Sequence, residues 1–276
     1  MKIDSHQHFW KYTEEEFGWI SDEMGKIRKS FLPSDLEGEL AKSEFDGTVA
    51  VQARQSLEEN DFLLALAEKY DLIKGVVGWV DLRSGALDGQ LEKYSQHPKF
   101  KGVRHVVQDE PDDRFILGEA FNKGISKLKS FGLTYDILVF PKHLPNVAEF
   151  VASHPNQPFV IDHLAKPDIK NKEINAWAEG MHAIGKYANV MCKLSGMVTE
   201  AAWNAWKKED FLPYLDVVFD AFGEDRIMIG SDWPVCLVAA NDYQEVMEVV
   251  LDYLGKKGES VVEKACGLNA ARFYGL

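Results

Sequence analysis

Short apolar segments alternate with longer amphipathic segments along the whole of this chain, and this alternation constrains its fold more than any other feature. Eight apolar segments are expected as strands: 1–8, 48–53, 74–82, 100–107, 133–139, 159–163, 190–196 and 227–234. Apolar residues recur with helical spacing between and after them, near 33–46, 62–67, 87–94, 115–130, 144–153, 174–187, 212–222, 243–254 and 260–273. Strands that alternate with helices in this way favour a parallel sheet with right-handed crossovers.

A chain of 276 residues with this pattern is typical of the α/β class and, within it, of a single (β/α)8 TIM barrel. An open, doubly wound sheet is the alternative. It is disfavoured because no Gly-X-Gly-X-X-Gly turn follows an early strand, and because unusual polar residues lie at the ends of nearly every expected strand. No shift in composition marks a linker, so we expect one domain over residues 1–276, with its functional groups at the carboxyl ends of the strands.

Charge and cysteine content limit which classes of binding partner and which cellular compartment we expect. Asp and Glu total 44 against 31 Lys and Arg, a net charge of −13 that opposes binding to nucleic acid or to an anionic membrane. A small molecule is the expected partner. The three cysteines, Cys192, Cys236 and Cys266, lack paired spacing, which disfavours a disulfide framework or a zinc finger. With no signal region before the first strand and no apolar run long enough for a membrane span, we expect a cytoplasmic protein.

Two histidines on the first expected strand point to a functional site. Successive side chains of a strand face opposite ways, so His6 and His8 emerge on one side and Gln7 on the other. Two further polar residues, His163 and Asp232, close the sixth and eighth apolar runs. Closing a barrel makes the first and eighth strands neighbours, so we expect His6, His8 and Asp232 to meet, with His163 at the same mouth. The alternative for His163 is a core histidine that is satisfied by hydrogen bonds.

Imidazole and carboxylate groups in this arrangement suit two kinds of carbonyl chemistry. As ligands, His6, His8, His163 and Asp232 suit Zn²⁺ or a related divalent ion, which lowers the pKa of bound water. Without a metal, the histidines still polarise a carbonyl while Asp232 removes a proton from water.

Donor side chains near the strand ends are candidates for holding substrate hydroxyl groups or a developing carboxylate. They are Gln52, Arg54, Arg104, Lys166 and Lys193. For Arg54 and Lys166 the alternative is a solvated surface residue. Trp233 and the aromatic residues of segment 9–33 are candidates for stacking on a ring, with packing as the alternative; that segment is either a lid or an apolar plug over the barrel end. Only one of the adjacent residues Arg104 and His105 points inward.

Three motifs in combination resemble the amidohydrolase superfamily, and more narrowly its amidohydrolase-2 branch of lactonases. They are His6-Gln7-His8, Asp162-His163 with Lys166-Pro167, and Gly230-Ser231-Asp232-Trp233-Pro234. The resemblance implies a (β/α)8 barrel that hydrolyses an ester, amide or lactone carbonyl. Within this branch, the sugar-lactone hydrolases of carbohydrate metabolism that act on L-fuconolactone- or L-rhamnonolactone-like substrates are the most similar. Asp232 is then the general base, and His6, His8 and His163 polarise the carbonyl or hold the ion that does.

The chain departs from the superfamily pattern at two strand ends. Many members carry a Lys or Glu after the fourth strand and a ligand His after the fifth, where this chain has Arg104-His105 and Val139-Phe140. A binuclear centre is therefore disfavoured, and we expect one divalent ion, zinc in first place, or none. The favoured function is hydrolysis of a small sugar-acid lactone. Nonoxidative decarboxylation of a small unsaturated or aromatic acid and ligand binding without turnover are the alternatives.

Overall fold

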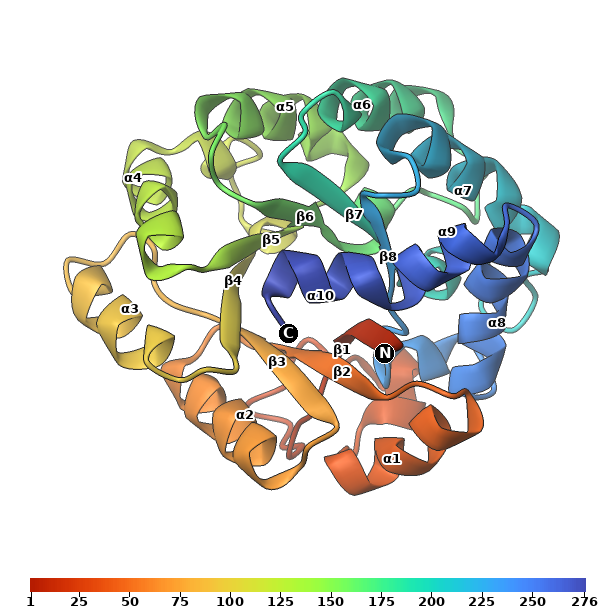
Figure 1. Ribbon diagram of the computed structural model, residues 1–276, viewed down its shortest axis with the longest axis horizontal. Helices are drawn as coiled ribbons and strands as arrows, with labels where there is room; N and C mark the ends of the chain where they lie inside the picture. The colour runs from red at the N-terminus through yellow and green to blue at the C-terminus, as the bar shows by residue number, and fades with distance from the viewer.

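Eight parallel strands follow one another around a barrel in chain order (Figure 1). This computed structural model describes residues 1–276. The strands are β1 (Ile3–Gln7), β2 (Gly47–Val51), β3 (Ile73–Gly78), β4 (Phe100–Val106), β5 (Thr134–Leu138), β6 (Phe159–Ile161), β7 (Val190–Leu194) and β8 (Ile227–Ile229). The expected (β/α)8 barrel is thus confirmed, and each strand lies within a segment predicted from the apolar pattern or overlaps it.

Most of the helices surround the barrel and cover the outward faces of its strands (Figure 1). The helices are α1 (Pro33–Lys42), α2 (Leu57–Lys69), α3 (Leu87–Ser95), α4 (Glu119–Leu128), α5 (Leu144–Ser153), α6 (Asn175–Gly185), α7 (Lys208–Phe222), α8 (Tyr243–Gly255), α9 (Glu259–Glu263) and α10 (Asn269–Tyr274). Strands that are buried on both faces explain why the expected segments are almost continuously apolar. None of these helices combines the length and the apolar character that a membrane span requires.

The barrel closes at the residues that the sequence singled out. The backbone N–H of His8 donates to the carbonyl of Trp233 at 2.7 Å, and that of Asp232 donates to the carbonyl of His6 at 2.8 Å. Closure of the sheet and assembly of the candidate site therefore depend on the same backbone hydrogen bonds.

A bulge in β1 turns its two histidines into the barrel. Between Asp4 and Gln7, β1 advances three residues while β2 advances two, from Thr48 to Ala50. An extra residue of this kind reverses the inward and outward alternation of a strand. Ile3 packs in the barrel interior, and without the bulge the residues that follow it on the same face would be Ser5 and Gln7 rather than His6 and His8.

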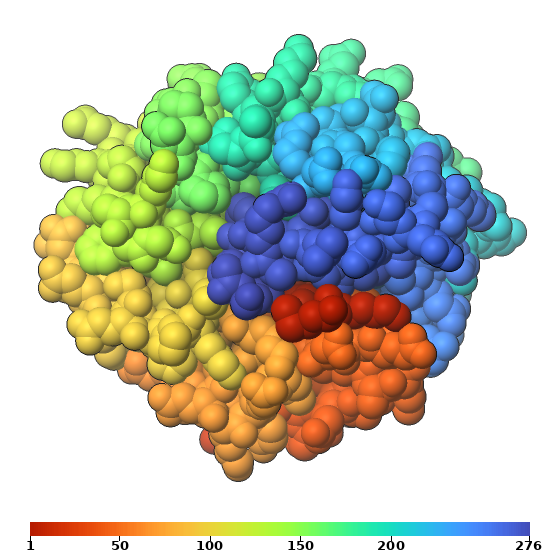
Figure 2. All heavy atoms as spheres, in the orientation of Figure 1, coloured from red at the N-terminus to blue at the C-terminus, as the bar shows by residue number.

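The last helix, α10, closes the amino-terminal end of the barrel. Its Ala270 and Tyr274 belong to one buried cluster with interior residues of the barrel, among them Ile3, Val77 and Met228. Figures 1 and 2 show this helix lying across the middle of that end, beside the N-terminal residues. The carboxyl ends of the strands are left as the open mouth.

Candidate active site at the carboxyl ends of the strands

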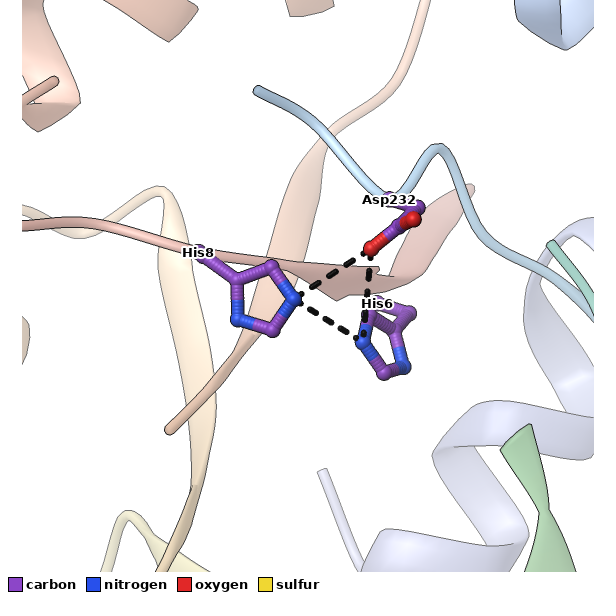
Figure 3. Close-up of side chains that lie close together, drawn as sticks. All are labelled: His6, His8 and Asp232. Carbon is purple, nitrogen blue, oxygen red and sulfur yellow. Dashed lines mark hydrogen bonds and ion pairs between the residues drawn. The ribbon is translucent and has the colours of Figure 1, made fainter. Parts of the chain in front are cut away.

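Four predicted side chains meet at the mouth of the barrel. Oδ1 of Asp232 lies 3.3 Å from Nε2 of His8, 3.8 Å from Nε2 of His6 and 3.8 Å from Nε2 of His163. The Nε2 atoms of His6 and His8 are 3.2 Å apart (Figure 3). All four side chains are buried.

Unusual backbone geometry aims two of these residues into the mouth. Asp232 has φ +56°, and His163 begins a run of four non-glycine residues, through Lys166, with φ between +51° and +56°. Each such residue costs about 1–2 kcal/mol in the left-handed region. The run persists because Leu164 is buried and its carbonyl accepts the indole N–H of Trp177 at 2.7 Å.

Two glycines make room for the imidazoles. A Cβ on Gly196 would lie 2.5 Å from Nδ1 of His163, and a Cβ on Gly230 would lie 2.8 Å from Cβ of His6. Gly196 also has φ +64°, which favours glycine. Neither ring can occupy its observed position beside a larger residue.

The Asp4 carboxylate ties β1 to the segment that carries Asp232. It accepts the backbone N–H of His6 at 3.1 Å, and the N–H and hydroxyl of Ser231 at 2.9 and 2.6 Å. Tyr243 of α8 donates its hydroxyl at 3.2 Å. Burial raises the pKa of Asp4 to about 6, although these hydrogen bonds oppose the rise.

Hydrogen bonds to the outer ring nitrogens fix the imidazoles. Nδ1 of His8 donates to the carbonyl of Val51 at 2.7 Å, so its Nε2 presents a lone pair to the site. Nδ1 of His163 lies 2.9 Å from Oγ of Ser195.

Burial and the mutual contacts of these groups set their charges. Burial would raise the pKa of Asp232, but the three surrounding histidines outweigh it and hold that pKa below its ordinary value. Burial lowers the pKa of His163 to about 4, although Asp232 and Asp162 oppose this. Near neutral pH the site therefore combines an ionised carboxylate with an uncharged imidazole.

A cavity of about 470 Å³ opens above these groups. Three of the four site residues line it, namely His8, His163 and Asp232. Arg54, Arg104 and Lys166 add three cations to its wall, and Asp109 adds a carboxylate. Its volume is within the range of roughly 300–1,000 Å³ that is usual for small-molecule sites.

Comparison with known proteins covers the whole chain. The model of a family described as Amidohydrolase matches residues 3–276. The chain is 38% identical over 287 residues to L-fucono-1,5-lactonase of Burkholderia multivorans, covering 100% of this chain and 96% of that protein. This chain belongs to the amidohydrolase family. The resemblance inferred from the three sequence motifs is thereby confirmed.

Two further relatives of this amidohydrolase are informative. A crystal structure of an amidohydrolase from B. multivorans with bound zinc superposes with a TM-score of 0.96 at 37% identity, covering 100% of this chain and 99% of that one. The L-rhamnono-gamma-lactonase of Scheffersomyces stipitis is 24% identical over 241 residues, covering 75% of this chain and 70% of that protein.

The ligand atoms of this amidohydrolase fit one divalent ion. A tetrahedral zinc site with bonds of about 2.0–2.1 Å places neighbouring ligand atoms about 3.3 Å apart. The separations of His6 Nε2, His8 Nε2 and Asp232 Oδ1 are 3.2, 3.3 and 3.8 Å. The backbone carbonyl behind His8 is the outer partner that a zinc-binding histidine ordinarily has.

Two cations flank His6, so their repulsion weakens binding of one ion at its Nε2 as well as disfavouring a second ion. Nη1 of Arg104 lies 3.3 Å from its Nε2, and Nζ of Lys193 lies 3.2 Å from its Nδ1. The expectation of at most one metal ion stays a prediction.

Three of the predicted substrate-binding residues do not line the cavity. Lys193 is fully buried beneath the site, where Asp136 and Asp162 hold its charge at 2.6 and 3.0 Å. Gln52 is buried in the barrel wall and donates to the carbonyl of Arg104 at 3.3 Å. Trp233 packs edge-on against Phe9 and Phe31, away from the mouth. Direct substrate contact by these three residues therefore does not fit the structure, because each is held by neighbours outside the cavity.

The structure also decides two alternatives that the sequence left open. Arg104 points inward and pairs with Asp162 at 3.0 Å, whereas His105 points outward, where its Nε2 meets Glu110 at 2.6 Å. Segment 9–33 packs mainly as an apolar plug, with Trp10 fully buried, but exposed Trp19 reaches the cavity rim.

Several cavity residues were not identified from the sequence. Gln55 follows β2, and Gln108 and Asp109 form a short turn after β4. Their position after strand ends was the available signal, but polar residues in loops are too common for that signal to select them.

Proposed function

We propose that this amidohydrolase opens a small sugar-acid lactone, of the L-fucono-1,5-lactone type, to the aldonic acid. The observation that carries the proposal is an ionised Asp232 within 3.8 Å of three imidazoles at the floor of a polar cavity. The names of the relatives, L-fucono-1,5-lactonase and L-rhamnono-gamma-lactonase, support this substrate class.

Asp232 is the proposed general base. Its carboxylate accepts a proton from the attacking water as the oxygen of that water bonds to the lactone carbonyl carbon. The same carboxyl group then returns the proton to the ring oxygen as the ester bond breaks. When no ion is bound, the lone pair on Nε2 of His8, 3.3 Å from Asp232, accepts the second hydrogen of the water and orients it.

His163 is the proposed donor to the carbonyl oxygen. When the Ser195 hydroxyl donates to Nδ1 of His163, the proton of the neutral ring is on Nε2, which faces the mouth. An uncharged imidazole with a low pKa is suited to stabilise an oxyanion without giving up its proton.

Cations on the cavity wall favour the charged product. Arg54, Arg104 and Lys166 line the cavity, and hydrolysis of a neutral lactone creates a carboxylate. Interactions that strengthen as negative charge develops lower the barrier more than uniform binding does. Gln55, Gln108 and Asp109 are placed to hydrogen-bond ring hydroxyl groups.

One divalent ion, zinc in first place, is the proposed cofactor. His6, His8 and Asp232 would hold it, with His163 beside them. A bound ion would supply Lewis-acid polarisation of the carbonyl and a lower pKa for water.

A panel of six-carbon lactones tests the function. Release of acid is followed with a pH indicator and corrected for uncatalysed opening, with and without chelator. An Asp232→Asn variant in the same buffer is the control for contaminating esterase. We expect the wild type to open L-fucono-1,5-lactone well above the rate of this variant. Equal rates for both proteins on every lactone would refute the proposal, and release of CO₂ from an aromatic acid would favour the decarboxylase alternative.

A further inference from the structure

A fully buried lysine lies directly beneath the candidate active site. The ammonium group of Lys193 on β7 has three protons and three neighbours: Oδ2 of Asp136 at 2.6 Å, Oδ1 of Asp162 at 3.0 Å and Nδ1 of His6 at 3.2 Å. Its side chain is 0% exposed, so water cannot replace any of these contacts. Nδ1 of His6 also lies 3.3 Å from Oδ1 of Asp162, the same oxygen that the ammonium group contacts, so the position of Lys193 affects both groups that the outer nitrogen of His6 meets.

The amino-terminal end of the barrel supplies further contacts to Asp136 and Lys193. Tyr274 of α10 donates its hydroxyl to Oδ2 of Asp136 at 2.8 Å, the same oxygen that accepts from Lys193. Its ring also lies under the ammonium group, with Nζ of Lys193 5.5 Å from the ring centroid. Tyr274 thus contacts both the carboxylate of Asp136 and the ammonium group of Lys193.

The hydroxyl of Tyr274 has no substitute within reach. Oδ1 of Asp136 is buried without a hydrogen-bond partner, so the carboxylate is held only through Oδ2. Without the hydroxyl, Lys193 is the only remaining hydrogen-bond donor to Asp136, and the balance of its contacts with Asp162 and His6 changes. Because a buried cluster of this kind is poorly screened, such a change is transmitted to His6.

From these contacts we propose that Tyr274 is a positioning residue for the candidate active site, acting on His6 through Asp136 and Lys193. The geometry of the mouth then depends on the docking of the last helix of the chain. Contacts behind a metal-binding histidine commonly contribute 10- to 100-fold to metal affinity or activity, so an effect of about tenfold is expected here.

The test compares two tyrosine-to-phenylalanine variants. Tyr274→Phe removes only the hydroxyl group. Tyr253→Phe is the matched control, because the hydroxyl of Tyr253 also donates to a carboxylate, Asp216, at 2.8 Å, but on the outside of the barrel. Zinc affinity is measured by competition with a chromogenic chelator, and kcat and KM are measured on the lactone that the wild type opens best.

For Tyr274→Phe we expect zinc affinity and kcat each to fall about tenfold, with KM changed less than twofold because the cavity lies at the other end of the barrel. Tyr253→Phe should match the wild type in all three quantities. The kcat comparison rests on the proposed function, whereas the zinc comparison does not, so a wild type without lactonase activity would leave the positioning role still tested. Tyr274→Phe with the zinc affinity of the control would overturn the inference.

A second pair of variants applies if Tyr274→Phe does not fold. Asp136→Asn keeps the side-chain shape and an oxygen for Lys193, and Asp216→Asn is its control. A loss of zinc affinity in Asp136→Asn alone supports the inference, and equal affinity in the two variants overturns it.

Discussion

Replacing Gly196 with alanine separates the cost of backbone strain from the cost of moving a site residue. At φ +64° the alanine destabilises the fold by about 1–2 kcal/mol. The new Cβ would also lie 2.5 Å from Nδ1 of His163, where ordinary contact begins at 3.4 Å, so the ring must recede by about 1 Å. A displacement of this size within a reacting constellation costs on the order of 100-fold in rate.

A second glycine provides the control for this experiment. Gly132 has φ +71° and ψ +20°, close to the conformation of Gly196, but a Cβ there would meet nothing within 4 Å. Gly132→Ala should therefore lose similar stability in urea denaturation and keep its lactonase kcat, while Gly196→Ala loses about 100-fold in kcat. If Gly196→Ala retains full kcat, the close approach to His163 does not position that ring.

Three further predictions concern the base, a buried acid and the cavity rim. Asp232→Asn should lose about 10²- to 10⁴-fold in kcat with an unchanged circular dichroism spectrum, because asparagine tolerates the positive φ of this position; retained turnover would exclude the base role. Burial raises the pKa of Glu59 to about 7 from 4.5, which favours the protonated form in the native state; stability is full below pH 4.5 and falls as pH rises toward 7. Glu59→Gln should reduce this pH-dependent loss in the free energy of unfolding by on the order of 3 kcal/mol, as measured by denaturation at several pH values. Parallel plots of unfolding free energy against pH for the two proteins would contradict this prediction. Trp19→Ala should raise KM roughly two- to tenfold with kcat unchanged, whereas Trp203→Ala, equally exposed but outside the cavity, should change neither.

The sequence was sufficient for the architecture because a parallel barrel buries both faces of its strands. The alternation of apolar segments and helices is a direct record of that burial, and all eight strands were found in order. The strand ends were placed too far along the chain. The eighth strand was expected over 227–234, but its regular part ends at Ile229, because the positive φ of Asp232 interrupts the extended backbone and residue type alone does not reveal it.

The candidate site was only partly accessible from the sequence. Barrel closure depends on strand order alone, so the meeting of His6, His8 and Asp232 was predictable. The burial of Lys193 was not, because its partners Asp136 and Tyr274 are distant in the chain and have no characteristic spacing. Strand alternation predicts whether a side chain points into or out of the barrel, but not how deep along the barrel it lies. That depth decides whether an inward side chain contacts the substrate or only holds the residues that do.

The left-handed turn from His163 to Lys166 has a consequence for protein engineering. Its four residues carry a combined backbone cost of roughly 4–8 kcal/mol, and relief of such strain is a usual route to a more heat-resistant enzyme. Ala165→Gly is the obvious choice, since it relieves the backbone and removes little side chain. The same change would loosen the peptide that aims His163, so a screen that selects for thermostability alone would tend to collect variants that survive heating and turn over slowly.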